Sequence, residues 1–376
     1  MAKRELTRWF EETRIQDTPK VGGKGASLGE MFQKLSESGV KVPNGFTLTT
    51  EAFSRFLNSE IPEKTWDNVR NPQGVEGVRD EAIKAKTLAE ALEVSLRDVD
   101  LGKELDLNGR AALARSLVRE TPVPESVRKA IAYDYSQLCD IYYPGVDVAV
   151  RSSATTEDSK EASFAGQYES FLNVSGEVEI VEKWRRCIAS MFTERSVGYH
   201  LENGLHPLDS AVAVVVMKMA RSDKACSGVM FTIDPDSGHE GVIHIASSYG
   251  LGELVVQGVV IPDTFTIWKE GLRKGKSPIV HRTLGSKEQM LVYGDEMANE
   301  VSSVRVPIDM RKRWSLDREE CVKLGEMAVL IEEYFDRPMD IEWAKDGVDN
   351  EIYIVQARPE TIHSKTEGNK ILMYKI

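Results

Sequence analysis

The alternation of hydrophobic and polar residues predicts a β-hairpin at 338–359, and the other features of the chain can be arranged around it. Apolar and β-branched residues fill 339–344 and 352–357. The turn-forming pairs Asp346-Gly347 and Asp349-Asn350 lie between these two runs. This pattern predicts two short antiparallel strands joined by one turn.

Four polar side chains interrupt the apolar pattern of this hairpin. Side chains alternate along a strand, so Asp340 and Glu342 share one face of the first strand, and Gln356 and Arg358 share one face of the second. Two carboxylates on a largely buried hairpin are costly unless a cation neutralises them. Asp340 and Glu342 could hold Mg²⁺, with Gln356 as a neutral ligand or orienting group and Arg358 facing a phosphate. A structural ion pair between Arg358 and Glu342 explains the pattern equally well, so the hairpin alone leaves both interpretations open.

Periodic runs elsewhere predict that helices and strands occur together. Residues 51–140 carry a helical pattern without candidate chemistry, which indicates a helical insertion. A further helix is predicted at 317–335, and it leads the chain into the hairpin. Strands are expected at 147–150, 169–174, 211–219, 227–233, 242–246, 264–268 and 279–283.

A glycine-rich stretch near the N-terminus is a candidate anion site. The sequence VGGKGASLGEM at 21–31 runs into an amphipathic helical pattern, and Lys24 adds a positive charge beside the glycines. Bare backbone N–H groups at a helix start attract anions. The Walker A pattern is absent, and a Gly-Gly-Lys-Gly run by itself is more often only the entry turn of a helix.

Arg151 is the second candidate phosphate ligand. It ends a buried strand and precedes a run of serine and threonine hydroxyls, and a glycine turn follows at 163–168. A permanently charged, bidentate guanidinium beside small hydroxyl residues suits a polyphosphate. A hairpin with a solvated Ser/Thr loop is the alternative, and we would favour it if no other phosphate feature existed.

Two further positions are candidate contacts for a nucleoside. The backbone from Met217 to Met219, at the end of a core strand, could offer hydrogen-bonding groups to an adenine edge. A Gly-Leu-Gly turn could place Glu253 against ribose hydroxyls. Taken alone, Glu253 reads more readily as an acidic residue in the first turn of a helix.

Composition and charge narrow the classes of function. The 376 residues suffice for one large domain or two to three subdomains, and the formal net charge is −12. This charge argues against a nucleic-acid surface, so a few focused cations must hold any anionic ligand. No apolar run approaches the roughly 20 residues of a membrane span, and the N-terminus lacks an apolar signal core. We therefore expect a cytoplasmic protein, whose four widely spaced cysteines are packing residues.

Five motifs in a fixed order resemble the N-terminal nucleotide-binding domain of the phosphoenolpyruvate synthase and pyruvate phosphate dikinase family. The resemblance implies an α/β, ATP-grasp-like fold of two lobes, at 1–205 with the insertion and at 206–361, followed by a linker or tail at 362–376. The motifs are VGGKGASLGEM (21–31), VAVRSSATTEDSKEASFAGQYESFLNV (148–174), ARSDKACSGVMFTIDPDSG (220–238), YGLGELVVQGVVIPD (249–263), and PMDIEWAKDG with YIVQARPET (338–361).

The resemblance also implies a role for each matching residue. The ligands are ATP and Mg²⁺, and the synthase looks closer than the phosphate dikinase. Lys24 and Arg151 would bind phosphate, Ala165, Gly166 and Gln167 would form a mobile phosphate loop, and Glu253 would contact the ribose. Asp340 and Glu342 would belong to the Mg²⁺-nucleotide site, and Gln356 and Arg358 would be a catalytic pair. Arg151 would also be essential for catalysis, and Gln356 would also lie near the metal.

In that family ATP gives its β,γ-pyrophosphoryl unit to a histidine on a separate swivelling domain, AMP and phosphate leave, and pyruvate is then phosphorylated. None of the six histidines here stands in the family's Ser-His-Ala context, so we expect the phosphohistidine on another domain or subunit. The chain is then either a fragment of a longer synthase or a natural split subunit, as in phenylphosphate synthase, where the acceptor is a phenol. A self-sufficient ATP-grasp kinase or ligase and a non-enzymatic ATP sensor are the alternatives.

Overall fold

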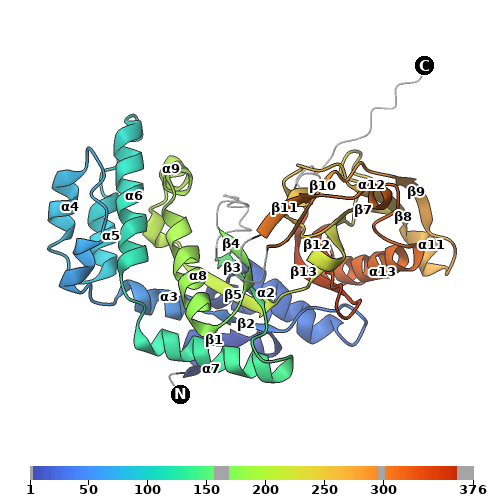
Figure 1. Cartoon of the computed structure of the whole chain (residues 1–376), viewed down its shortest axis with the longest axis horizontal. Coiled ribbons are helices and arrows are strands. Elements are labelled where there is room, and N and C mark those ends of the chain that lie inside the picture. The colour runs from blue at the N-terminus through green and yellow to red at the C-terminus, as the bar shows by residue number, and fades with distance from the viewer. Residues whose placement is uncertain (1–2, 156–168, 295–300, 362–376) are drawn as a thin grey trace. The chain divides into compact units, whose positions relative to one another are not determined.

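The computed structural model describes residues 3–155, 169–294 and 301–361, and it has a mixed α/β fold with several sheets (Figure 1). The predicted α/β class is therefore confirmed. Two predicted segments lie outside the described residues. They are the phosphate loop at Ala165, Gly166 and Gln167, and the linker or tail at 362–376.

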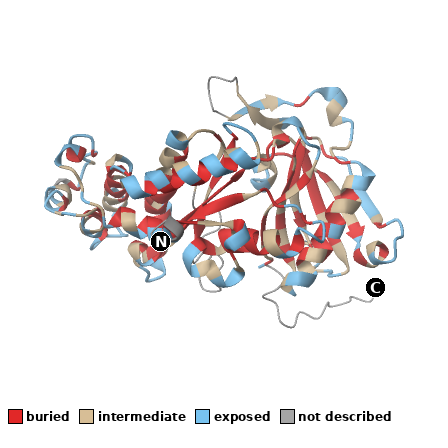
Figure 2. Cartoon of the chain, turned by 90° about the horizontal axis from the view of Figure 1, so that it is seen from below, coloured by how far each residue is buried: buried red, intermediate tan, exposed pale blue. Residues whose placement is uncertain are grey.

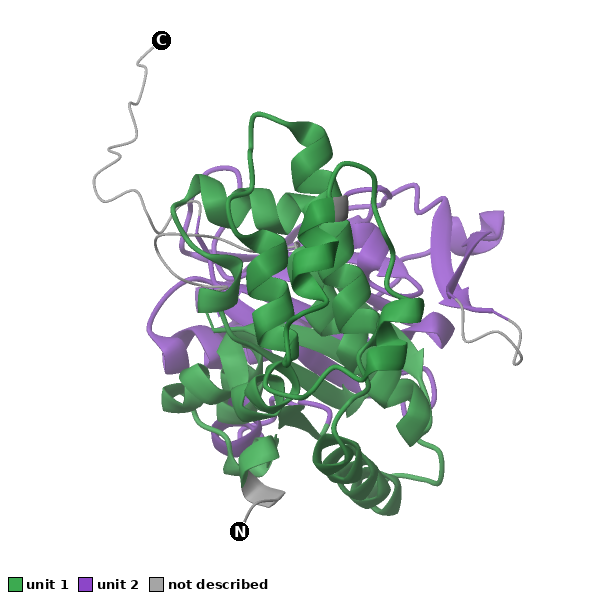
Figure 3. Ribbon diagram, turned by 90° about the vertical axis from the view of Figure 1, so that its left-hand side faces the viewer, with its two compact units in different colours: residues 1–30, 44–219 green, residues 31–43, 220–376 purple. Residues whose placement is uncertain are grey.

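The chain folds into two compact units, coloured separately in Figure 3. Unit 1 comprises 1–30 and 44–219, and unit 2 comprises 31–43 and 220–376. These units are defined by internal packing, and the lobe boundaries expected from the sequence stay a prediction.

Unit 1 is built on an antiparallel sheet with the strand order β1-β2-β5-β3-β4. Its central strand β5 consists of seven consecutive buried residues, VAVVVMK, as expected for a strand covered on both faces. The bounds are β1 Thr7–Trp9, β2 Gly45–Leu48, β3 Val148–Ala154, β4 Ser170–Val174 and β5 Val212–Lys218.

Helices surround this sheet, and several of them lie between Thr50 and Ile141, the range in which the sequence predicts a helical insertion. One hydrophobic core joins these helices to the strands, and Trp184 packs on Phe56 with ring centroids 5.4 Å apart. The helices are α1 Lys3–Leu6, α2 Thr18–Leu35, α3 Thr50–Leu57, α4 Glu76–Ala82, α5 Leu88–Leu96, α6 Glu104–Glu120, α7 Glu125–Ile141, α8 Glu177–Ala189 and α9 Glu194–Glu202, and residues 31–35 of α2 belong to unit 2. Short 3-10 turns lie at Phe10–Glu12, Ile15–Asp17, Glu63–Asp67, Ser190–Phe192 and Pro207–Asp209.

Unit 2 is built on a second antiparallel sheet with the order β13-β12-β6-β7-β8-β9, and β10 pairs only with β11. The bounds are β6 Cys226–Phe231, β7 Val242–Tyr249, β8 Asp263–Trp268, β9 Ile279–Thr283, β10 Gln289–Tyr293, β11 Val301–Arg305, β12 Met339–Lys345 and β13 Ile352–Pro359. The helical segments are the 3-10 turn Ser222–Lys224, α10 Glu253–Val256, α11 Lys269–Arg273, α12 Ile308–Arg311 and α13 Arg318–Phe335.

Helix α13 covers one face of this sheet and contacts β7, β8 and β12. Its buried residues, among them Cys321, Leu324 and Ala328, recur every three or four positions, so they form one apolar face. Asp317 caps the helix, because its side chain accepts the Glu320 N–H at 2.9 Å. Figure 2 shows the strands as mostly buried, while the outer sides of the helices are exposed.

All four cysteines are unpaired thiols; Cys187, Cys226 and Cys321 are buried, as expected of packing residues, whereas Cys139 is half-buried. Across the part of the chain that the structure describes, no helix combines the length and the apolar character that crossing a membrane requires.

Candidate functional site

The predicted hairpin is present as β12 and β13. Its turn closes between Asp346 and Glu351, where the Asp346 N–H donates to the Glu351 carbonyl at 2.8 Å. Within that turn Asn350 adopts a left-handed conformation with φ of 60°, which asparagine tolerates better than most residues.

The register of the hairpin brings the four predicted polar residues together. Asp340 lies directly opposite Arg358, and Glu342 lies directly opposite Gln356. Directly opposed residues of an antiparallel pair point to the same face, so all four share one face of the sheet. Buried Ile341 lies between the two carboxylates in sequence and points to the other face, against the core.

A β-bulge is needed for this arrangement. The pairing shifts after Glu342, so that Trp343 lies opposite Ile354 and Val355 is the extra residue on β13. Without the bulge, Gln356 would point to the same side as Ile354, which is fully buried in the core. The extra residue instead directs Gln356 to the face that carries Glu342.

Arg358 forms an ion pair with Asp340, the residue directly opposite it on the hairpin. Its Nε and NH2 lie 2.9 Å and 2.8 Å from Asp340 Oδ2. Burial nevertheless raises the pKa of Asp340 above its ordinary value, the arginine offsets this only in part, and the neighbouring Glu342 and Glu360 carboxylates add to the rise. The neutral form of the Asp340 carboxyl is therefore favoured more than in water, even though the carboxylate pairs with Arg358.

The donor set on this face fits Mg²⁺ that arrives with a phosphate ligand. Asp340 and Glu342 supply carboxylate oxygens and Gln356 supplies an amide oxygen, which are hard ligands of the kind Mg²⁺ prefers. Within the described residues there is no group of three or more Asp, Glu, His or Cys side chains that could hold a metal. Asp340, Glu342 and Gln356 therefore form no closed metal cage by themselves, and Mg²⁺ commonly takes one or two carboxylates and completes its shell with phosphate oxygens and water.

Lys24 lies in unit 1, just after a break in helix α2. Gly22 has φ of 71° and ψ of 172°, so the helix begins earlier than the glycine run predicts and is interrupted there. A Cβ at Gly22 would lie 2.0 Å from the Ser153 carbonyl oxygen, so only glycine fits this approach.

Ser153 joins the glycine turn to strand β3. Its buried hydroxyl accepts the Gly25 N–H at 3.0 Å and donates to the Val21 carbonyl at 2.8 Å. Arg151 lies two residues earlier on the same strand, where it pairs with Val215 and Ser170, and it shares a strand face with Ser153. The two predicted phosphate ligands of unit 1 therefore lie on elements that contact each other.

The charge of Lys24 acts on a thiol that packs against β3. Burial raises the pKa of the Cys187 thiol, the Glu169 carboxylate adds to the rise, and the positive charge of Lys24 opposes it. The Cys187 thiol lies 3.9 Å from the Val150 carbonyl, next to Arg151 in sequence. Lys24 is thus near enough to β3 to act on a group packed against that strand.

The predicted adenine contact at Met217 and Met219 is placed at the end of β5. The Met219 N–H donates to the Asp147 carbonyl at 2.9 Å, so this donor already serves the sheet. An adenine contact at these residues stays a prediction.

Sequence reasoning overlooked the neighbouring Lys218, which is only 6% exposed, with its ammonium 5.6 Å from the Tyr142 ring centroid. A lysine within an otherwise apolar strand was the available signal.

Glu253 is the first residue of the short helix α10 in unit 2, which matches the plainer of its two sequence interpretations. The turn before it is well supported, since the Ser227 hydroxyl donates to the Gly250 carbonyl at 2.6 Å and the Leu251 N–H donates to the Leu291 carbonyl at 2.9 Å. Ser227 belongs to β6, which pairs with β12. A ribose contact at Glu253 stays a prediction.

Residues 18–375 match the family model described as "Pyruvate phosphate dikinase, AMP/ATP-binding domain". Phosphoenolpyruvate synthase of Aquifex aeolicus is 41% identical over 380 residues, which cover 99% of this chain and 41% of that protein. The Escherichia coli enzyme of the same name is 40% identical over 96% of this chain and 42% of its own length. A probable phosphoenolpyruvate synthase of Pyrococcus abyssi is 35% identical over 97% of this chain and 44% of its length.

The sheets, the hairpin and the glycine turn thus belong to a chain of the nucleotide-binding class. This chain is a member of the AMP/ATP-binding domain family of pyruvate phosphate dikinase. It spans about two fifths of the length of the phosphoenolpyruvate synthases that it matches.

Proposed function

We propose that this chain is the ATP-binding, catalytic part of a dikinase-type phosphotransferase that serves the phosphorylation of pyruvate. The observation that carries the proposal is the single polar face of the hairpin, where Asp340 lies opposite Arg358 and Glu342 lies opposite Gln356. The names of the relatives favour pyruvate over a phenol as the final acceptor.

In the proposed reaction a histidine nitrogen on a separate domain or subunit attacks the β-phosphorus of ATP. The new N–P bond forms as the bond from the β-phosphorus to the bridging oxygen of the α-phosphate breaks, and AMP leaves with that oxygen. Water then cleaves the β,γ-anhydride, which releases phosphate and leaves one phosphoryl group on the histidine for transfer to pyruvate.

The residues of this chain would stabilise the charge that shifts between phosphoryl groups. Lys24 and Arg151 hold phosphate oxygens, and Arg358 and Gln356 orient the reacting group. Asp340 and Glu342 would hold Mg²⁺, which neutralises phosphate charge when it is bound. The pairing of Arg358 with Asp340 keeps the guanidinium at a defined position on the polar face.

The test uses ATP labelled at a chosen phosphate together with a partner that bears the phosphohistidine. Label from the β-phosphate should appear on a partner histidine while AMP accumulates, and label from the α-phosphate should stay with AMP. The dikinase proposal is wrong if the chain by itself phosphorylates pyruvate or forms ADP in step with product, because that outcome defines a self-sufficient kinase. Phosphorylation of a phenol in place of pyruvate would retain the mechanism and change the acceptor.

A further inference from the structure

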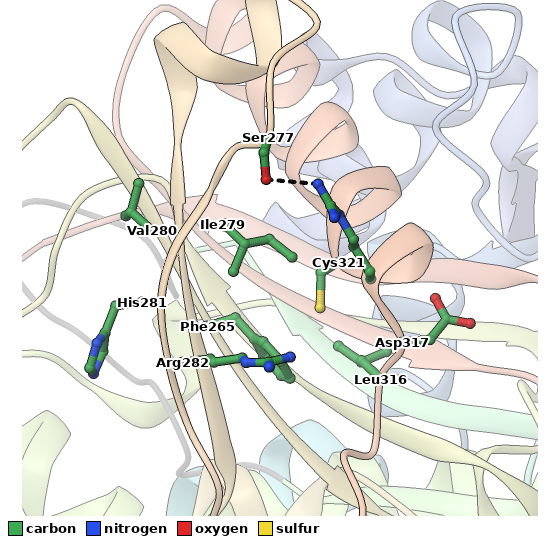
Figure 4. A pocket seen from close by; sticks show the side chains of 10 residues that line it. Phe265, Ser277, Ile279, Val280, His281, Arg282, Leu316, Asp317 and Cys321 are labelled. Carbon is green, nitrogen blue, oxygen red and sulfur yellow. Dashed lines mark hydrogen bonds between the residues drawn. The ribbon is translucent and has the colours of Figure 1, made fainter.

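Unit 2 contains a pocket of about 420 Å³ that none of the predicted site residues lines (Figure 4). It lies between strand β9 and the start of helix α13, and its size falls within the range of small-molecule sites in proteins. Its floor is apolar, since Phe265, Leu316 and Cys321 are at most 3% exposed. Burial raises the pKa of the Cys321 thiol to about 12, so this floor carries no charge at neutral pH.

Two arginines give the rim of the pocket a positive charge. Neither Arg282 nor Arg318 forms an ion pair with a carboxylate among the residues that the structure describes. The Asp317 carboxylate also lines the pocket, but it accepts the Glu320 N–H as the cap of α13.

Neighbouring side chains hold both guanidinium groups in place. Arg282 lies 4.9 Å above the ring centroid of Trp314, which in turn packs against Phe265 at 5.3 Å. Arg318 donates to the Ser277 hydroxyl at 2.7 Å, drawn as the dashed line in Figure 4. Cations fixed in this way bind an anion with a smaller loss of side-chain entropy than freely rotating ones.

The pocket lies on the face of the sheet opposite the polar face of the hairpin. Arg282 is paired with Phe265 on β8, and directly paired residues on β7 and β6 continue this row to Ile341 on β12. Ile341 lies between Asp340 and Glu342 in sequence and therefore points away from both. A ligand bound beside Arg282 would not reach the phosphate chemistry proposed for the hairpin.

We propose that this pocket, which we call the Arg282–Arg318 pocket, is a second ligand site for a small organic anion. The two arginines would hold a phosphate, sulfonate or carboxylate group, and the Phe265 floor would cover an aromatic or apolar body. Because the site lies apart from the polar hairpin face, its ligand is an effector and not a substrate. That the pocket binds an organic anion does not depend on the function proposed above, whereas the assignment of its ligand as an effector rests on that function.

Naphthalene-1-sulfonate is a suitable probe, because it combines an anionic group with an aromatic body. Isothermal titration of the full chain should give one bound probe, and Arg282→Gln and Arg318→Gln should each weaken binding about tenfold, the loss of one charge-assisted contact. Arg282→Lys keeps the charge without the planar group and should weaken binding less. Uncharged 1-naphthol should bind far more weakly than the sulfonate.

Two control variants make the result specific. Arg273→Gln removes an exposed arginine of unit 2 that pairs with Glu333 and does not line the pocket, so affinity for the probe should not change. Arg151→Ala should also leave it unchanged, because Arg151 belongs to unit 1. Wild-type affinity in both Gln variants, each with an unchanged melting temperature, would overturn the proposal. Equal binding of 1-naphthol, or a loss of probe binding only in Arg151→Ala, would overturn it as well.

Discussion

At the scale of single residues, the hairpin separates two kinds of carboxylate. Glu342 lies on the polar face opposite Gln356, whereas Glu351 at the turn end pairs with Lys41 and Lys323 at 2.7 and 2.9 Å. These lysines hold the pKa of Glu351 below its usual value, as expected of a carboxylate in a structural ion pair. The two glutamates therefore offer a matched comparison of function and stability.

We expect Glu342→Gln to lower the phosphotransfer rate by at least about a hundredfold, because the amide keeps the shape but removes the charge that would hold Mg²⁺. Its melting temperature should stay close to that of the wild type. Glu351→Gln should leave the phosphotransfer rate normal and lower the free energy of unfolding by up to about 1 kcal/mol. Rates measured per folded molecule and thermal melts of both variants separate the roles, and normal turnover in Glu342→Gln would contradict the metal assignment.

Asp340 should give a pH-dependent stability signature. Its pKa is raised in the folded state, chiefly by burial, so its ionisation opposes folding. The neutral Asp340 carboxyl contributes fully to the stability of the fold below the pKa of about 3.9 that an aspartate has in the unfolded chain. This contribution is lost as the pH rises through the pKa of Asp340 in the folded protein. In metal-free solution Asp340→Asn should therefore melt higher than the wild type near pH 7.

Thermal melts from pH 3 to pH 8 test this expectation. The difference in melting temperature between Asp340→Asn and the wild type should shrink as the pH falls towards 3, where the wild-type carboxyl is also neutral. A variant that melts lower than the wild type at pH 7 would show that the Arg358 ion pair outweighs the burial of the charge.

At the scale of elements, the glycine turn of α2 and strand β3 depend on one hydroxyl group. Ser153 bonds to both Val21 and Gly25 of the turn, and Lys24 lies between these two residues. A buried N–H that loses its acceptor destabilises its local conformation by roughly 1–3 kcal/mol. The position of Lys24 therefore depends on a residue two places after Arg151.

Ser153→Ala should raise the dissociation constant of ATP about tenfold, since the turn loses its acceptor and donor while the core stays intact. Ser95→Ala is the control, because its hydroxyl is equally buried but bonds only to the Ala91 carbonyl within helix α5. Titration calorimetry with ATP gives the measurement for both variants. Equal affinity in Ser153→Ala and the wild type would remove Ser153 from the phosphate-binding arrangement.

At the scale of the whole molecule, unit 2 is stabilised by a buried ion pair away from the polar face. Lys287 and Asp263 are both fully buried and form an ion pair, and Asp263 also accepts the N–H groups of Gly285 and Ser315, each at 2.8 Å. These contacts connect β8 to the segments that lead into β10 and α13. Removing one partner of such a pair leaves an uncompensated charge and costs about 3–5 kcal/mol.

Lys287→Met should therefore destabilise unit 2 strongly. Hydrogen exchange followed by mass spectrometry should show faster exchange in β7, β8 and α13, whereas β3 and β5 of unit 1 should stay protected, since none of the contacts of Lys287 lies there. The double variant that combines Lys287→Met with Asp263→Asn should recover part of the loss, because it leaves no unpaired charge. Unchanged exchange in α13 would contradict the structural role of the pair.

The amino-acid sequence by itself determined the elements and the candidate residues. Apolar runs predicted β5, β12 and β13, helical periodicity predicted α13, and residue types selected the candidates on the hairpin and around Arg151. These signals are local, because side-chain periodicity and turn chemistry act over a few neighbouring residues.

Only the tertiary structure decided how the candidates meet. The bulge after Glu342 turned Gln356 to the polar face, and the strand register paired Arg358 with Asp340. Ser153 became important only because β3 lies against the glycine turn, more than a hundred residues away in sequence. Register, bulges and such contacts depend on packing between distant segments, and periodicity along one stretch of chain carries no information about that packing.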